Sequence, residues 1–180
     1  GNICAGLMAY KSGLPVKHFI AACNANDIVP EYLQTQNYQP KKAIATISNA
    51  MDVGDPSNFV RILEIFNKDF ASLKNILSGT GISDDETKQT LKGVYRKYNY
   101  LLDPHGAVGY LALRQYQQEV DDEKGIVLET AHPVKFPESI EEVLNIKVPV
   151  PASIAGIMNK EKKSVLIKAD YEELKEYLMK

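Results

Sequence analysis

The sequence contains no tryptophan, only two cysteines and three histidines, and almost no net charge. Cys4 and Cys23 lack the spacing of metal ligands, and the scattered histidines add no zinc pattern. We therefore expect both cysteines to be buried thiols in a reducing cytoplasm. The net charge of −2, with acidic and basic residues interleaved, excludes the positive footprint of a nucleic-acid binder and favours a small-molecule or protein partner.

Long apolar runs are also absent, so we predict neither a transmembrane helix nor a membrane partner. The sequence has no charged leader of the kind that marks a signal peptide, so we expect a cytoplasmic location. The sequence has no initiator methionine and passes from Gly1 and Asn2 directly into an apolar helical pattern. We therefore expect a chain cut from something longer.

The composition that is present, with 44% hydrophobic and 24% charged residues among 180, suits one globular domain with a core. Hydrophobic periodicity predicts an α/β fold. We expect strands at residues 16–23, 43–47, 126–129 and 164–168. Helices are expected at residues 2–11, 28–34, 59–77 with an interruption near Asn67, 83–98, 107–118, 138–144 and 154–159, and after Asp170. Ser83 and Glu86 fit a capping box.

The most informative stretch is SNAMDVGDPSNFVR, residues 48–61, which we call the polar turn. Gly54 can take a positive φ, and Pro56 suits a turn or an early helical position. Ser57 or Asn58 is a candidate N-cap, so free backbone N–H groups would face a phosphate or a carboxylate. The alternative interpretation is an ordinary capped turn. Short polar side chains that can bond the local backbone are Asn49, Asp52, Asp55, Ser57 and Asn58.

Four blocks of the sequence carry a resemblance to a known family: GNICAGLMAYKSGLPVKHFIAACNANDIVP, SNAMDVGDPSNF, DPHGAVGYLAL and LETAHPVKFPESI. In this order they resemble the threonine synthases, pyridoxal-phosphate enzymes of fold type II, over essentially the whole chain. The resemblance implies an incomplete three-layer α/β sandwich, a mostly parallel sheet with flanking helices. Residues 1–180 would form the C-terminal portion of the large domain.

The resemblance also implies residues that contact the cofactor, pyridoxal phosphate. The family's phosphate loop reads roughly S-G-N-F-G-N, and the chain begins at its last two residues, Gly1 and Asn2. Thr130 in TAHP would meet the pyridine nitrogen with a neutral hydroxyl, unless it simply ends a strand. The Schiff-base lysine lies in an earlier segment, so no lysine here is assigned to it. We expect the chain alone to be inactive and to need the missing N-terminal part of the same enzyme.

The enzyme that the resemblance implies is a lyase that converts O-phospho-L-homoserine and water into L-threonine and phosphate. The polar turn becomes the candidate site for the substrate phosphate, with possible donors at Asn49, Ser57, Asn58 and Arg61. Asp52 and Asp55 would hold the turn, accept N–H groups or bind the substrate ammonium. His105 and His132 are candidates to bond substrate or loop carbonyls, although a histidine in a turn is more often a structural hydrogen-bonder.

Two rival functions remain open from the sequence. Another fold-type II lyase, such as a serine or threonine dehydratase, would not need the phosphate site in the polar turn. A non-catalytic α/β binding module would keep the scaffold for an anionic metabolite or a protein partner.

Overall fold

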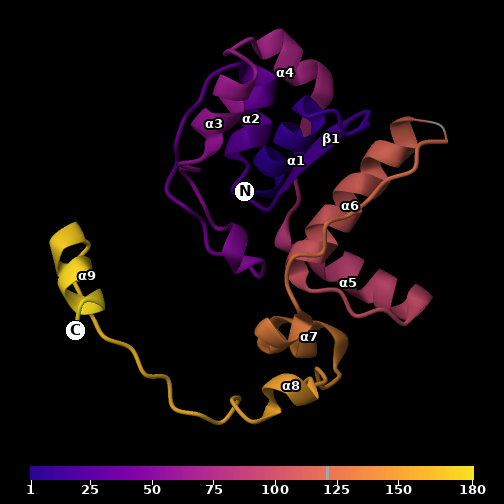
Figure 1. Ribbon diagram of the computed structural model, residues 1–180. Helices are drawn as coiled ribbons and strands as arrows, with labels where there is room; N and C mark the ends of the chain where they lie inside the picture. Colours follow the sequence, from indigo (N-terminus) through magenta and orange to yellow (C-terminus); the bar gives the residue numbers. More distant parts are fainter. Residues whose placement is uncertain (121) are drawn as a thin grey trace. The chain divides into compact units, whose positions relative to one another are not determined.

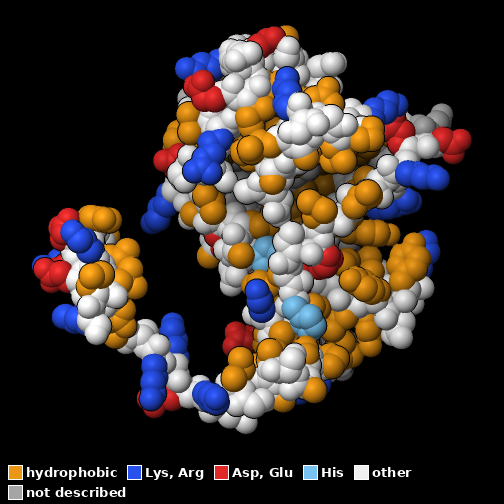
Figure 2. Space-filling view, in the orientation of Figure 1, with side chains coloured by type: hydrophobic (Ala, Val, Ile, Leu, Met, Phe, Trp, Pro, Cys, Tyr) orange, Lys and Arg blue, Asp and Glu red, His pale blue; other side chains and the backbone are white. Residues whose placement is uncertain are grey.

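The computed structural model describes residues 1–120 and 122–180. Its contacts divide the chain into two compact units, Gly1–Val148 and Pro149–Lys180, which we describe separately. No helix in the described residues is long and apolar enough to cross a membrane. Acidic and basic side chains are intermixed on the face shown in Figure 2.

The first unit contains most of the regular structure (Figure 1). In chain order its elements are α1 (Asn2–Lys11), β1 (Phe19–Cys23), α2 (Ile28–Thr35), the 3-10 helix η1 (Asn49–Met51), α3 (Phe59–Ile65), α4 (Phe70–Ile76), β2 (Leu77–Gly81), α5 (Asp84–Tyr98), α6 (Pro104–Glu119), η2 (Pro133–Lys135) and α7 (Pro137–Leu144).

Strands β1 and β2 pair in parallel, with Phe19 opposite Leu77 and Cys23 opposite Gly81. Because side chains alternate across a strand, the two faces of this sheet meet different helices. Phe19 packs into the core against α1. His18, just before β1, bonds Ser78 Oγ at 2.9 Å and stacks on Tyr116 of α6. Helices therefore cover both faces, which confirms the α/β sandwich with a parallel sheet, although its sheet is small.

The main core lies on the face of α1 to α4, where apolar side chains recur at helical spacing. Its buried members include Leu7, Ala21, Leu33, Phe59, Ile62, Phe66, Leu73 and Leu77. A second cluster joins α5 to α6 through Leu91, Val94, Leu102 and Ala107. Cys4 is buried, as expected. Cys23 is half-buried, and burial of its thiol raises its pKa to about 12.

Several predicted helix boundaries are confirmed by local chemistry. The interruption near Asn67 separates α3 from α4, where Asn67 and Lys68 both have positive φ. The capping box is present, because the Ser83 side chain accepts from the Glu86 N–H while Glu86 accepts from the Ser83 N–H.

The strand predictions were less accurate. Residues 43–47, 126–129 and 164–168 form no strand, since no neighbouring strand pairs with them among the described residues. Strand β2 was missed, because Gly79 and Gly81 suggested a helix breaker rather than a strand. Gly79 permits close packing of β2 on α2, because a Cβ there would make a tight contact at 3.1 Å from Pro30 Cα.

The second unit contains α8 (Ala152–Ala155) and α9 (Tyr171–Leu178). The helix predicted at 154–159 is therefore shorter and begins earlier. Asp170 caps α9 as predicted, accepting N–H bonds from Glu172 and Glu173.

Candidate functional site

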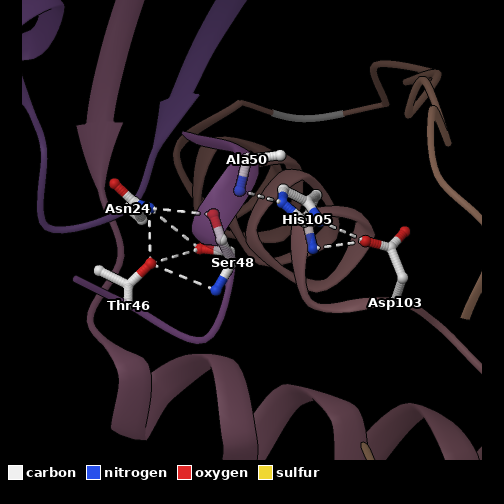
Figure 3. Close-up of polar contacts among 6 residues, drawn as sticks. All are labelled: Asn24, Thr46, Ser48, Ala50, Asp103 and His105. Atoms are coloured by element: carbon white, nitrogen blue, oxygen red, sulfur yellow. Dashed lines mark hydrogen bonds and ion pairs between the residues drawn. The ribbon is translucent and has the colours of Figure 1, made fainter. Parts of the chain in front are cut away.

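A hydrogen-bond network follows the carboxyl end of β1, the edge where ligands bind in open α/β sheets (Figure 3). Asn24 is only 1% exposed. Its Nδ2 donates to Thr46 Oγ1 at 2.8 Å, to Ser48 Oγ at 3.1 Å and to Asp52 Oδ1 at 2.9 Å. Its Oδ1 accepts the Asn26 N–H at 2.9 Å. Asn24 therefore attaches the polar turn to the end of β1.

Asp52 holds the turn from within. Its Oδ2 accepts the Thr46 N–H at 3.0 Å, while its Oδ1 accepts the Thr46 hydroxyl at 2.8 Å and Asn26 Nδ2 at 3.1 Å. Both carboxylate oxygens are thus occupied by donors of the chain itself. Asp55 accepts the Tyr38 hydroxyl at 2.8 Å, and burial together with this bond and the Asp55 charge raises the pKa of Tyr38 to about 12.

Gly54 is required by close approach and not by a positive φ, because among the described glycines only Gly13 has a positive φ. A Cβ at Gly54 would lie 1.9 Å from the Lys41 carbonyl oxygen. The Lys41 N–H also donates to the Gly54 carbonyl at 2.8 Å. This glycine therefore fixes where the turn meets the segment before it.

The remaining polar side chains of the turn are available to a ligand. Asn58 occupies the N-cap position of α3, but its side chain makes no capping bond. Arg61 is exposed and forms no ion pair with any residue that the structure describes. Asn49 and Ser57 are likewise exposed. The turn thus combines a fixed backbone with unoccupied amide, hydroxyl and guanidinium donors.

His105 is brought to the turn by α6. Asp103 is the buried N-cap of α6. Its Oδ1 accepts a hydrogen bond from the backbone N–H of His105 at 2.8 Å and another from Nδ1 of the His105 ring at 2.6 Å. Nδ1 therefore carries the hydrogen, and Nε2 accepts the Ala50 N–H at 3.2 Å (Figure 3). The Phe136 ring lies 4.6 Å from the imidazole. His105 bonds an amide of the turn rather than a loop carbonyl.

The other predicted site residues lie apart from this network. Thr130 is exposed and belongs to the irregular segment, residues 125–130. His132 Nδ1 accepts the Val134 N–H at 3.1 Å and so caps η2. Gly1 and Asn2 are exposed at the N-terminus of α1. Hydrogen bonds among the described residues do not connect any of these four to the polar turn.

Sequence reasoning missed Asn24, Asn26 and Asp103 as parts of the site. Asn24 and Asn26 directly follow an apolar strand, which signals a polar edge, and Asp103 precedes Pro104 and a helical pattern, which signals an N-cap. The bonds of Asn24 and Asn26 to Asp52 were not predictable, because they join segments that are far apart in the sequence. The same holds for the bond between His105 and Ala50.

Comparison with known proteins finds threonine synthases. A family model described as "Threonine synthase, C-terminal" matches residues 106–178. The threonine synthase of Haemophilus influenzae is 44% identical over the whole chain, which covers 41% of that relative. The threonine synthase of Serratia marcescens is 42% identical over 99% of the chain and 41% of its own length.

Solved structures agree with this match. The crystal structure of threonine synthase from Escherichia coli aligns with a TM-score of 0.85 at 40% identity, covering 98% of this chain and 40% of that one. A pyridoxal-phosphate-bound threonine synthase from Brucella melitensis aligns with a TM-score of 0.79 at 28% identity, covering 98% and 43%.

The parallel strands, the helices on both faces and these neighbours define the fold of the type II pyridoxal-phosphate enzymes. Within that class, the relatives and solved structures that match the chain along its whole length are threonine synthases, the family that its four sequence blocks resemble. The chain spans 41% of the length of these two curated relatives. Neither the dehydratase nor the binding-module alternative is favoured.

Proposed function

We propose that this chain forms the C-terminal part of a cytoplasmic threonine synthase, a pyridoxal-phosphate-dependent lyase that converts O-phospho-L-homoserine and water into L-threonine and phosphate. An N-terminal part of the same enzyme would complete the active site. The match to threonine synthases along the whole chain supports this proposal.

The polar turn binds the phosphate of the substrate in this proposal. The observation that carries the assignment is the contrast within the turn between a fixed backbone and unoccupied donors. Asn24 and Asp52 hold the backbone, while Arg61 remains exposed and unpaired among the described residues. A guanidinium binds phosphate through charge-assisted hydrogen bonds. The accompanying neutral donors are Asn49, Ser57 and Asn58.

The acidic residues of the turn have supporting roles. Asp52 uses both oxygens on the chain's own donors, so it stabilises the turn and does not contact an anion. Asp55 is exposed and retains one oxygen free of the Tyr38 bond, which suits the substrate ammonium. His105 positions the Ala50 amide, and His132 is already used as a cap.

In this proposal, two parts of the chain would hold the two ends of the cofactor. Gly1 is the N-cap of α1, whose first-turn N–H groups are suited to a phosphate. The Thr130 hydroxyl is exposed and would hold the pyridine nitrogen without donating a full charge. Pyridoxal phosphate, when bound, supplies the electron sink for carbon acidity in the substrate.

A chimera tests the proposed function. This chain would replace the matching segment of the Haemophilus influenzae enzyme, and phosphate release from O-phospho-L-homoserine would be measured. We expect activity, and we expect Arg61→Gln to raise KM by about tenfold to a hundredfold, since a charge-assisted hydrogen bond is lost. Arg96→Gln on the exposed face of α5 is the matched control and should leave KM unchanged.

Two results would contradict the assignment. A folded chimera that binds cofactor but releases no phosphate would contradict the activity. Equal KM values for the two arginine variants would instead remove the turn from the substrate site. Titration of the unmodified chain with inorganic phosphate supplies an independent readout, because backbone amide shifts should then concentrate at Asn49, Ser57, Asn58 and Arg61.

A further inference from the structure

The carboxylate of Asp103 is only half satisfied by the contacts described above. Oδ1 accepts the backbone N–H and the imidazole of His105. Oδ2 is buried and has no hydrogen-bond partner among the described residues, in a side chain that is 0% exposed. A buried carboxylate oxygen without a donor is costly, so this atom calls for a donor that the contacts described above do not supply.

Glu129 is the group placed to supply that donor. Its carboxyl lies against the first turn of α6, because a Cβ added to Gly106 would fall 2.3 Å from both Oε1 and Oε2. With glycine at this position, the Glu129 carboxyl can lie directly on the backbone of α6, and a larger residue would displace the end of the Glu129 side chain. The geometry therefore brings two carboxyl groups together at the N-terminus of α6.

The charges of the pair are unequal. Burial, the hydrogen bond with Asp103 and the Asp103 charge raise the pKa of Glu129 to about 8. Burial also raises the pKa of Asp103, but hydrogen bonds from His105 and Glu129 outweigh it and leave that pKa below its ordinary value. At neutral pH, Glu129 thus keeps its proton while Asp103 is ionised.

We propose that Glu129 is a positioning residue whose carboxyl donates a hydrogen bond to Oδ2 of Asp103 and thereby holds His105 and the Ala50 amide of the polar turn. Each link has a donor and an acceptor: Glu129 to Asp103, His105 Nδ1 to Asp103 Oδ1, and the Ala50 N–H to His105 Nε2. The functional consequence rests on the proposed function, since it treats the turn as the phosphate site.

Loss of the Glu129 proton breaks this series at its first link. Two carboxylates then face each other, and Asp103 loses the donor on its buried oxygen, so His105 is less firmly held and Ala50 gains freedom. The turn should then bind an anion more weakly. Other titratable side chains lining the hollow beside Glu129 are Tyr98, Tyr100 and Tyr110, with Lys97 and Arg114 acting on Tyr98 and Tyr110.

Nuclear magnetic resonance of the complete 180-residue chain tests the relay without cofactor or substrate. The side-chain carboxyl carbon of Glu129, the ring nitrogens of His105 and the amide of Ala50 would be followed against pH. We expect all three to change with one midpoint near 8. A Glu129 midpoint near its ordinary value of 4.5, or an Ala50 amide that does not follow it, would overturn the proposal.

Two variants separate positioning from a merely structural role. Glu129→Gln keeps a donor toward Asp103 but cannot ionise, so the Ala50 shift should become independent of pH while the Nδ1–H tautomer of His105 persists. Glu142→Gln, on the exposed side of α7, is the matched control and should keep the original midpoint. A titration of Ala50 that survives in Glu129→Gln would contradict the relay.

Sulfate is a suitable probe of the consequence for the turn, because its charge does not change over this pH range. Between about pH 7 and about pH 9, the affinity of the chain for sulfate should fall by about threefold to tenfold, the value of one hydrogen bond. In Glu129→Gln it should stay constant. If the chain binds no sulfate while Glu129, His105 and Ala50 still titrate together, the phosphate-site assignment is refuted and the relay is supported. If the sulfate affinity depends on pH equally in the unmodified chain and in Glu129→Gln, the relay is refuted.

Discussion

The polar turn and the irregular segment (residues 125–130) differ in how they are held, although the proposed function gives each one half of the site. The turn is fixed by buried side chains of its own chain, chiefly Asn24 and Asp52. The irregular segment lies along α6, with Gly125 against Leu113 and Val127 against Gly109. Backbone hydrogen bonds between this segment and other described residues are not found.

The side chains of the irregular segment alternate as they would in a strand. Val127 and Glu129 face α6, whereas Ile126 is 88% exposed and Leu128 is 64% exposed. Thr130 continues the exposed side. The polar turn is held by bonds from side chains of nearby segments, so it takes a fixed form in this chain. The irregular segment needs a neighbouring strand to pair with its backbone, and the described residues supply none.

Gly54→Ala should break the better-held region with the largest effect. The added Cβ would overlap the Lys41 carbonyl and disrupt the Lys41 to Gly54 hydrogen bond, so we expect a loss of about 3 kcal/mol or more in the free energy of unfolding. Denaturant titration measures it. Gly93→Ala is the control: no atom lies within 4 Å of its Cβ in α5, so it should stabilise by up to about 1 kcal/mol. Equal effects would show that Gly54 is not tightly packed.

Asp52→Ala should have the next largest effect. It leaves donors of Asn24, Asn26 and Thr46 without their acceptor, so we expect a loss of about 2 to 3 kcal/mol. Asp55→Ala removes only the exposed Tyr38 bond and should cost less than about 1 kcal/mol. Urea midpoints of the two variants provide the comparison. A smaller loss for Asp52→Ala than for Asp55→Ala would mean that the network does not hold the turn.

The same contrast explains which features the sequence could predict. Caps such as Ser83 and Asp170 were correct because their partners lie within three residues. The polar turn was recognisable from its own composition. Strand pairing was not predictable, because each residue of β1 pairs with one far along the chain in β2, as Phe19 does with Leu77. Strand β2 also contains two glycines, which locally disfavour a strand.

The candidate site was predictable only in part, for the same reason. Asp52 was expected to hold the turn, and its contacts agree with that role. Its partner Asn24 and the contact between His105 and Ala50 depend on tertiary structure, which no local pattern specifies. The roles of Thr130, Gly1 and Asn2 toward a cofactor stay predictions.

The irregular segment reaches the first turn of α6 through Glu129, whose titration makes the stability of the chain depend on pH. The folded-state pKa of Glu129, about 8, exceeds its ordinary value of 4.5, so the folded chain holds the extra proton between these values. Its stabilisation is therefore complete below about 4.5 and is lost as pH rises to about 8. The carboxyl of Glu129 is partly buried against α6, but the residue keeps exposed surface, so solvent screening reduces the effect and we expect a loss on the order of 1 kcal/mol.

The measurement is the free energy of unfolding against pH for the unmodified chain and for Glu129→Gln. Their difference should grow across this interval, with the unmodified chain losing stability relative to the variant. Parallel curves would show that Glu129 titrates alike in the folded and unfolded chains. The pKa of Asp103 lies below its ordinary value of 3.8, so this carboxylate affects stability in acid. The stability that it contributes is lost as the pH falls below 3.8.

Leu128→Ala should have the smallest effect, although Leu128 lies in an apolar run that predicts a buried strand. Because this side chain is 64% exposed, its removal deletes few contacts, and we expect a change within about 0.5 kcal/mol. Leu91→Ala is the matched control, because Leu91 is 1% exposed in the cluster of α5 and α6 and should cost about 2 to 5 kcal/mol. Both variants would be compared by denaturant titration at several protein concentrations. A loss above about 1 kcal/mol for Leu128→Ala that grows with concentration would show that a second copy covers the irregular segment. A loss of that size independent of concentration would show that the segment packs within its own chain, and the contrast with the polar turn would fail.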